Sequence, residues 1–272
     1  MCGIFAIINN NFKISDEYIE MSFNKGKNRG PDFSILNKYD NTLSLGFHRL
    51  SINGLDSNSN QPLIFNKVYL ICNGEIYNYK QLYSYLNIQP FSNSDCEIII
   101  HLYCLYGIEK ALQLLDGVFA FVLIDKRNEL NKIFIARDPF GVRPLYSMID
   151  EQNKIFAFAS ELKCLSPIYC SKITQFSPGT YSQIFKFDED NYTHYANNKK
   201  YYSVSIAPSR HFYSIDITTI LTNIQHYFSN AVKKRYENCM RPVACLLSGG
   251  LDSSLVTALA NKYHLHKTNQ NI

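Results

Sequence analysis

Short runs of apolar residues, separated by turn residues, dominate the first two thirds of the chain. Such runs predict β-strands, here at Ile4–Ile8, Leu43–Phe47, Val68–Cys72, Val118–Ile124, Lys132–Arg137 and Lys154–Ala159. Helical spacing of apolar residues predicts helices at Ser15–Lys25 and Glu97–Leu115. One face of the second helix should carry Ile98, Leu102, Leu105 and Tyr106. Because strands and helices mix without a regular βαβ repeat, we expect a layered α+β domain with largely antiparallel sheets.

The pattern changes near residue 190. Residues 191–215 are rich in Asn, Lys, Tyr and Ser with few periodic apolar positions, which is typical of a connector. Helical spacing then predicts an amphipathic helix over Ile217–Arg235, an apolar strand over Val243–Leu247 and a second helix over Leu255–Tyr263. We therefore expect a domain of residues 1–190, a connector of residues 191–215, and the start of an α/β domain in residues 216–272.

Composition excludes several classes of protein. The net charge is only +4, and the one basic cluster, Lys233 to Arg235, fits a solvated helix face better than a nucleic-acid surface. The eight cysteines form no CxxC pair, which favours a reduced, cytoplasmic chain without a structural metal. The apolar stretch Gly3–Ile8 is too short for a signal peptide or a membrane span. We expect a cytoplasmic protein that binds neither nucleic acid nor membrane.

Cys2 is the first candidate for chemistry, because removal of Met1 would leave one residue with both a thiol and a free α-amine. An α-amine titrates about one unit below a free thiol, so it can accept the thiol proton near neutral pH. One residue can therefore serve as nucleophile and base. Alone, Cys2 could also be an ordinary cysteine of the leading strand, so the other motifs must decide.

Further motifs follow Cys2 in order along the chain. They are Arg29-Gly30-Pro31-Asp32, His48-Arg49-Leu50-Ser51-Ile52, Gln61-Pro62, Asn73-Gly74-Glu75-Ile76-Tyr77-Asn78, Ser94-Asp95-Cys96-Glu97 and Arg137-Asp138-Pro139-Phe140-Gly141-Val142-Arg143. With Met1-Cys2-Gly3-Ile4, they resemble the class II glutamine amidotransferases over roughly residues 1–185. The resemblance implies a four-layer αββα sandwich, the N-terminal-nucleophile hydrolase fold, and L-glutamine as substrate. Asn28 and Ala6 depart from the family pattern, which usually has His and Gly there.

The resemblance implies a role for each residue of a glutamine site. Attack by Cys2 creates an oxyanion, and the Asn73 side chain and the Gly74 N–H are its expected donors. Arg49 would bind the α-carboxylate and Asp95 the α-ammonium group. The rest of the expected site is Leu50, Ser51, Ile52, Asn53 and Glu75. From the residues alone, Arg49 could instead form a surface ion pair, and Asp95 could cap a helix.

A second motif lies between the expected strand and helix of the second domain. Its residues are Leu247, Ser248, Gly249, Gly250, Leu251, Asp252, Ser253 and Ser254. Glycines at a strand-to-helix turn expose backbone N–H groups to phosphate, the helix dipole favours negative charge, and Ser hydroxyls add donors. The motif resembles the pyrophosphate loop of ATP-dependent adenylating enzymes and lacks the ending of a Walker A loop. The alternative is a bare glycine–serine turn.

Together the two motif sets resemble the glutamine-hydrolysing asparagine synthetases. Amidophosphoribosyltransferases, glucosamine-phosphate synthases and glutamate synthases do not continue into such a loop, and β-lactam synthetases typically lack the cysteine. The resemblance implies ATP with Mg²⁺, L-aspartate as second substrate, and ammonia attacking a β-aspartyl-AMP.

Residues 216–272 are too few for a nucleotide-binding sheet, so we expect a fragment, a split enzyme or a decayed gene. Such a chain alone would only hydrolyse glutamine. The alternative from another class is a non-catalytic or ammonia-donating subunit that docks onto a separate synthetase chain through residues 217–263. A further alternative is another class II amidotransferase. The expected assembly is left open between a homodimer and such a complementing chain.

Overall fold

The computed structural model describes residues 1–39, 42–128, 131–168, 172–186, 192–203 and 216–268. The chain divides into two compact units, Met1–Ser203 and Val204–Ile272. Within the described ranges, no helix is long and apolar enough to cross a membrane. Those same ranges contain no group of three or more His, Cys, Asp or Glu side chains that could hold a metal ion.

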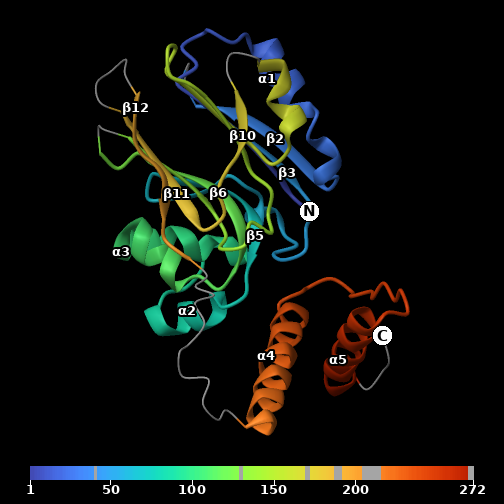
Figure 1. The fold of residues 1–272 in the computed structure, drawn as a ribbon. Helices are drawn as coiled ribbons and strands as arrows, with labels where there is room; N and C mark the ends of the chain where they lie inside the picture. Colours follow the sequence, from blue (N-terminus) through green and yellow to red (C-terminus); the bar gives the residue numbers. More distant parts are fainter. Residues whose placement is uncertain (40–41, 129–130, 169–171, 187–191, 204–215, 269–272) are drawn as a thin grey trace. The chain divides into compact units, whose positions relative to one another are not determined.

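Two six-stranded sheets form the first unit, and neighbouring strands in both pair antiparallel (Figure 1). The first sheet has the order β10-β8-β9-β1-β3-β2 and contains β1 (Gly3–Ile8), β2 (Phe33–Lys38), β3 (Leu43–Arg49), β8 (Tyr146–Asp150), β9 (Ile155–Ala159) and β10 (Ile173–Gln175). The second has the order β12-β11-β7-β6-β5-β4 and contains β4 (Leu63–Phe65), β5 (Val68–Ile76), β6 (Gly117–Asp125), β7 (Lys132–Arg137), β11 (Thr180–Lys186) and β12 (Tyr192–Lys200).

Strand β1 shows why the two sheets stack. Successive side chains of a strand point to opposite faces, so Ile4 and Ile8 enter the core between the sheets, where Val122 of the second sheet also lies. Phe5 points the other way and packs with Phe23 of helix α1 (Asp16–Asn24). Both faces of β1 are thus covered, which explains its unbroken apolar sequence.

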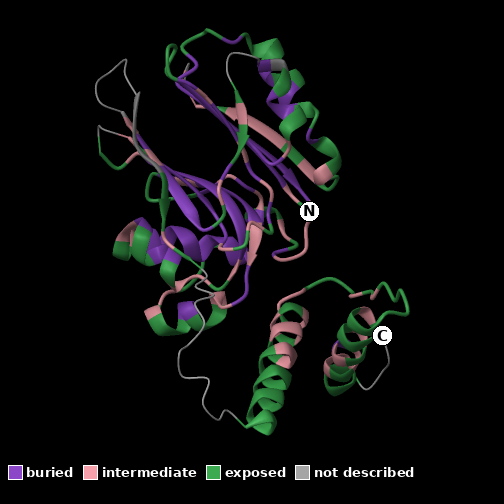
Figure 2. Cartoon of the chain, viewed as in Figure 1, coloured by how far each residue is buried: buried purple, intermediate pink, exposed green. Residues whose placement is uncertain are grey.

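Helices α2 (Tyr79–Leu86) and α3 (Ile98–Leu114) cover the outer face of the second sheet. Their apolar residues share a core with alternate residues of β5 and β6, among them Leu70 and Phe121. In Figure 2 the central strands β1 and β6, which lie between the helical layers, are almost entirely buried. The order helix, sheet, sheet, helix confirms the predicted α+β sandwich. Short 3₁₀ turns complete the unit, namely η1 (Lys27–Arg29), η2 (Ser57–Ser59), η3 (Asp95–Glu97), η4 (Leu162–Cys164) and η5 (Ser166–Ile168).

The predicted apolar face of α3 is wrong in its second half. Ile98 and Leu102 are fully buried, whereas Leu105 is 54% and Tyr106 45% exposed. Gly107 has φ +77° and interrupts the helical backbone directly after them. A uniform helical period therefore does not describe this segment.

A strand lies inside the expected connector. Residues 192–200 form β12, which pairs antiparallel with β11. The reason is that β11, already paired with β7, would otherwise present an open edge of unpaired backbone groups. Backbone hydrogen bonds between strands do not require apolar side chains, so the polar composition of this segment did not predict the strand. The later part of the connector, residues 204–215, lies outside the described residues.

The second unit contains helices α4 (Ile217–Glu237) and α5 (Leu251–Thr268), close to the two predicted helices. They contact one another, with the Tyr263 hydroxyl donating to the Ser229 carbonyl at 3.2 Å. The predicted strand at 243–247 is wrong: these residues have no strand structure, and Leu246 is 95% exposed. A strand of this kind requires a neighbouring strand for its backbone hydrogen bonds, and residues 216–268 provide none.

Candidate functional site

A pocket in the first unit brings together motifs that lie far apart in the sequence. It is lined by Met1, Cys2, Phe47, Arg49, Leu50, Ile52, Asn53, Ser59, Gln61, Cys72, Asn73, Gly74, Glu75, Ser94, Asp95, Cys96 and Arg143. The candidate nucleophile, both oxyanion donors and both residues expected to bind the amino-acid head therefore share one cavity. Among the predicted glutamine-site residues, Ser51 is not in this lining, and its N–H donates to Asp32 Oδ2 at 2.7 Å.

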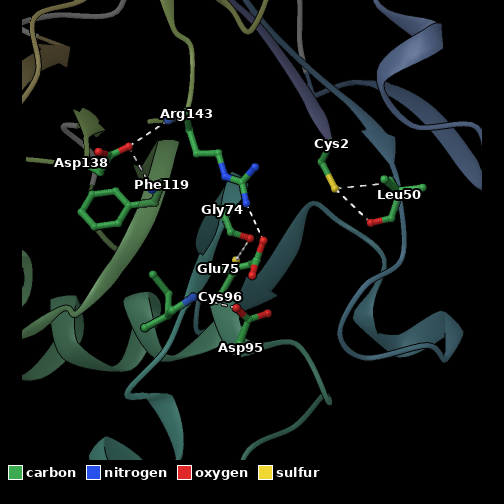
Figure 3. Close-up of polar contacts among 10 residues, drawn as sticks. Cys2, Leu50, Gly74, Glu75, Asp95, Cys96, Phe119, Asp138 and Arg143 are labelled. Atoms are coloured by element: carbon green, nitrogen blue, oxygen red, sulfur yellow. Dashed lines mark hydrogen bonds and ion pairs between the residues drawn. The ribbon is translucent and has the colours of Figure 1, made fainter. Parts of the chain in front are cut away.

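Cys2 is held at the start of β1 by the Arg-Gly-Pro-Asp segment. Arg29 Nε donates to the Cys2 carbonyl at 2.7 Å, and Arg29 is itself fixed by Glu161 at 3.3 Å. The Cys2 Sγ lies 3.4 Å from both the N and the O of Leu50 (Figure 3). Gly30 permits this arrangement, because a Cβ there would come within 2.3 Å of the Arg49 backbone N.

Burial at the N-terminus favours a neutral amine. Burial lowers the pKa of the Met1 α-ammonium group and outweighs the raising effect of the Cys2 charge, and the nearby cations Arg29 and Arg143 lower the pKa further. Burial raises the pKa of the Cys2 thiol. Near neutral pH the thiol therefore holds its proton and needs a base, while an α-amine in this environment is suited to accept one.

The edge of β5 presents the Gly74 N–H to the pocket. Phe119 of β6 lies opposite Gly74. Its N–H donates to Asp138 Oδ2 and its carbonyl accepts the Asp138 N–H, both on the side of β6 that faces away from β5. Since the N–H and C=O of one strand residue point to the same side, Gly74 and Phe119 form a non-hydrogen-bonded pair. The Gly74 N–H must then point away from β6, to the side that β4 leaves uncovered because it pairs only with residues 68–70.

Two side chains flank this uncovered edge. The Gln61 side-chain amide bonds to both the N and the O of Cys72, and Asp95 Oδ2 accepts from the Ile76 N–H at 2.7 Å. The Gly74 N–H lies between these two positions along the same edge. Packing requires glycine at this position, because a Cβ at Gly74 would lie 2.7 Å from the Val118 carbonyl oxygen of β6.

Asn73 supplies the second donor. Its side chain is 1% exposed and lines the pocket, and Nδ2 has no hydrogen-bond partner among the described residues. Buried amide donors are normally satisfied. An unpaired donor beside Cys2 and the Gly74 N–H is what an oxyanion hole requires before substrate arrives.

Asp95 is 5% exposed and accepts the Ile76 N–H. Burial raises its pKa to about 6 and the neighbouring Glu75 adds to this, against the lowering effect of the hydrogen bonds it accepts. The N-cap of η3 is Ser94, and no side-chain capping bond is found there. Asp95 is therefore a buried carboxylate of the pocket and not the cap of that turn.

Arg49 is fixed by the loop that follows it. Nη1 donates to Asp56 O at 2.9 Å and to Asn60 Oδ1, and Nη2 donates to the carbonyls of Asn53, at 3.4 Å, and Gly54. Arg49 is 5% exposed, so it is not a surface ion pair. The loop of residues 53–60 thus determines how the guanidinium faces the pocket.

The glycine–serine segment opens α5. Gly249 has φ +84°, and the Ser254 N–H donates to the Gly250 carbonyl at 3.1 Å as the first helical bond. The Ser253 and Ser254 hydroxyls also donate to that carbonyl, at 3.1 and 2.8 Å. The space where a Gly249 Cβ would stand is open. An exposed helix N-terminus with an open glycine turn fits a phosphate group, and the two serine hydroxyls bond back to the Gly250 carbonyl without capping a helix N–H.

Most of the chain is similar to known proteins. The family model of the glutamine amidotransferase domain matches residues 1–228. The chain belongs to this family. The model described as asparagine synthase matches residues 223–269, which include the glycine–serine segment.

Proteins similar to this chain include a probable glutamine-hydrolyzing asparagine synthetase of Acanthamoeba polyphaga mimivirus, 38% identical over 96% of this chain and 50% of that protein. The human glutamine-hydrolyzing asparagine synthetase is 37% identical over 95% of this chain and 48% of its own length. The chain thus spans about half the length of these relatives. Among solved structures, the glutamine phosphoribosylpyrophosphate amidotransferase of B. subtilis is 18% identical, with a TM-score of 0.56 over 96% of this chain and 64% of that one, which supports the fold.

The sequence prediction missed one charged residue of the pocket, Arg143. It pairs with Glu75, is 8% exposed, and its Nε has no hydrogen-bond partner in the described part (Figure 3). Its backbone N–H donates to Asp138 Oδ2 at 3.0 Å, and Arg137 Nε donates to its carbonyl at 2.7 Å. The sequence could have indicated Arg143 as a site residue, because it ends one of the motifs that carry the family resemblance.

Proposed function

We propose that this protein hydrolyses L-glutamine to L-glutamate and ammonia, with Cys2 as the nucleophile after removal of Met1. The observation that carries the proposal is the buried Nδ2 of Asn73, which lies in the same pocket as Cys2 and has no hydrogen-bond partner in the ranges that the structure describes. A preorganised donor without a partner costs stability, and it is useful where negative charge develops during a reaction.

The proposed reaction has two halves. The Cys2 amine takes the thiol proton, and the sulfur attacks the side-chain amide carbon of glutamine. The negative oxygen of the tetrahedral intermediate accepts from Asn73 Nδ2 and the Gly74 N–H, and the protonated amine returns its proton to the leaving ammonia. Water, deprotonated by the same amine, then cleaves the thioester to give glutamate and free Cys2.

The remaining pocket residues would hold the amino-acid head of glutamine. Ionised Asp95 would accept from the α-ammonium group. Arg49 would bind the α-carboxylate, which would displace the longest of its present contacts, the 3.4 Å bond to the Asn53 carbonyl. Glu75, Leu50, Ile52 and Asn53 complete the lining.

We also propose that the chain is the glutamine-hydrolysing part of an asparagine synthetase. Its similarity to such enzymes supports this, as does the asparagine synthase match in residues 223–269. The N–H groups of Gly249 and Gly250 and the hydroxyls of Ser248, Ser253 and Ser254 would hold the phosphates of ATP, with Leu247 and Asp252 beside them. ATP with Mg²⁺ would supply activation of the aspartate carboxyl. The aspartate site and a cytoplasmic location stay predictions.

A glutaminase assay tests the first proposal. Protein whose N-terminal residue is Cys2, as verified by mass spectrometry, should release ammonia from glutamine, and Cys2→Ala should release none. Cys2→Ser controls for the shape of the side chain. Undiminished ammonia release by Cys2→Ala would exclude Cys2 as the nucleophile.

The alternative of a docking subunit has one observation in its favour. Helix α4 has no buried residue, and its apolar Ile217 and Ile224 are 69% and 59% exposed. Retained Met1, together with binding to a separate synthetase chain and no ammonia release, would support that alternative.

A further inference from the structure

The two groups that would hold the amino-acid head are carried by different sheets. Arg49 ends β3 of the first sheet, whereas Asp95 lies beside β5 of the second, where its carboxylate accepts the Ile76 N–H. Binding of an α-carboxylate and an α-ammonium group together requires a fixed spacing between these side chains. Strand pairing within one sheet cannot provide that spacing.

Direct hydrogen bonds join the two segments. Asp56 Oδ2 accepts from Asn93 Nδ2 at 2.8 Å, and the Ser59 hydroxyl accepts from the Asn93 backbone N–H at 3.2 Å. Ser59 is 2% exposed and also donates its hydroxyl to Asp56 Oδ1 at 3.2 Å. Asn93 is therefore held through both its side chain and its backbone. We refer to Asp56, Ser59 and Asn93 as the bridge.

Gly54 shows how closely the two segments approach. Its φ is +58°, and a Cβ there would lie 2.8 Å from the Asn93 carbonyl carbon and 2.3 Å from the Ser59 Oγ. A side chain at position 54 would push the loop away from Asn93. This packing contact is independent of the hydrogen bonds and supports the same conclusion.

Each end of the bridge continues to a residue of the pocket. On one side, the Asp56 carbonyl accepts from Arg49 Nη1 at 2.9 Å. On the other, the Glu97 carboxylate accepts from the N–H groups of Phe91 and Ser92, at 2.9 and 2.7 Å, and so orders the turn that leads through Asn93 to Asp95. Movement of Asn93 relative to Asp56 would change the distance from Arg49 to Asp95.

We propose that Asp56, Ser59 and Asn93 are positioning residues that set the spacing between Arg49 and Asp95, and thereby select substrates with an α-amino-acid head. This inference rests on the proposed glutamine hydrolysis and deepens it. Ser59 lines the pocket, whereas Asp56 and Asn93 are outside its lining. We expect loss of the bridge to weaken recognition of the head and to leave the chemical step intact.

The test compares L-glutamine with glutaramate, the same amide without the α-amine. Ser59→Ala should raise the KM for glutamine about tenfold, the typical effect of losing a well-ordered polar contact. Asn93→Ala should raise it about threefold, because this side chain is exposed to solvent. In both variants kcat should stay within about twofold, and hydrolysis of glutaramate should not change. A parallel loss with both amides would mean that the bridge only supports the fold and would overturn the inference.

A swapped pair and a matched control sharpen the test. Asp56→Asn combined with Asn93→Asp restores a donor and an acceptor, and the amide oxygen introduced at position 56 can still accept the Ser59 N–H. The double variant should therefore recover a KM near that of the wild type. Asn153→Ala is the control, because Asn153 Nδ2 also donates to an aspartate, Asp150, at 2.8 Å, in the turn between β8 and β9. It should leave the KM unchanged.

Hydrogen exchange tests the bridge without catalysis. In Ser59→Ala the amides of residues 92–95 should exchange about tenfold faster than in wild type, while exchange in β1 stays the same. Unchanged protection would refute the inference even in a protein that hydrolyses glutamine. Faster exchange in a protein that releases no ammonia would support the role of the bridge in ordering residues 92–95 and would contradict the proposed glutamine hydrolysis.

Discussion

Asn73→Ala should separate activity from stability. In most core positions, loss of a buried polar side chain lowers both, because its hydrogen bonds are lost. Asn73 is 1% exposed, and its Nδ2 has no partner in the described protein. Leaving such a donor unpaired costs about 1–3 kcal/mol. Truncation removes that cost and loses packing worth a similar amount, so the free energy of unfolding should change by no more than about 1 kcal/mol.

The same substitution should strongly reduce turnover. Loss of one of two oxyanion donors typically lowers kcat by about 10²–10³, equivalent to about 2.7–4 kcal/mol. KM should change little, since Asn73 would interact with the oxyanion and not with the amino-acid head. The assay is ammonia release over a range of glutamine concentrations, with thermal and denaturant unfolding of the same samples.

Asn78→Ala is the matched control. Its Nδ2 donates to the Leu114 carbonyl at 2.9 Å and its Oδ1 accepts the Asp116 N–H at 3.0 Å, so both ends of this amide are satisfied. It should lower stability by about 1–2 kcal/mol with little change in kcat. If Asn73→Ala lowers stability as Asn78→Ala does, or lowers kcat less than tenfold, the assignment of Asn73 to the oxyanion hole is wrong.

Two further predictions concern the same pocket. Burial raises the pKa of Asp95 to about 6. Below that pH the carboxyl is protonated and no longer attracts an α-ammonium group, so the KM for glutamine should rise about tenfold from pH 7 to pH 5. A KM that does not change with pH would contradict the assignment of Asp95 to the α-ammonium group. Gly74→Ala places a Cβ 2.7 Å from the Val118 carbonyl. This overpacking should lower the free energy of unfolding by about 1–3 kcal/mol and the melting temperature by several degrees. An unchanged melting temperature would refute the packing argument.

Sequence reasoning identified most of the regular core because its signals are local. Strands β1, β3, β5, β6, β7 and β9 and helices α1 and α3 were predicted to within a few residues. The strands it missed are short or polar, such as β4 (Leu63–Phe65) and β12 (Tyr192–Lys200). Such strands exist because an adjacent strand offers backbone hydrogen bonds: β4 pairs with residues 68–70 of β5, and β12 pairs with β11. These bonds are made by the backbone and leave no apolar pattern in the sequence.

The strand expected at 243–247 shows the reverse error. Its apolar residues predict a strand buried on both faces, yet the described part of the second unit has no sheet that could accept it. Local propensity alone does not make a strand. The helices at 217–237 and 251–268 form because their backbone hydrogen bonds are internal.

For the candidate site, the sequence alone determined which residue types are present and in what order: a cysteine next to the initiator Met, an Asn-Gly pair, and Arg49 and Asp95 for the two charges of an amino acid. Those choices follow from the chemistry of amide cleavage. Only the tertiary structure decided that they share one pocket, that the Gly74 N–H faces it from an uncovered strand edge, and that Asp56, Ser59 and Asn93 join the loops of two different sheets. These properties depend on contacts between segments distant in the chain, and no local pattern records them.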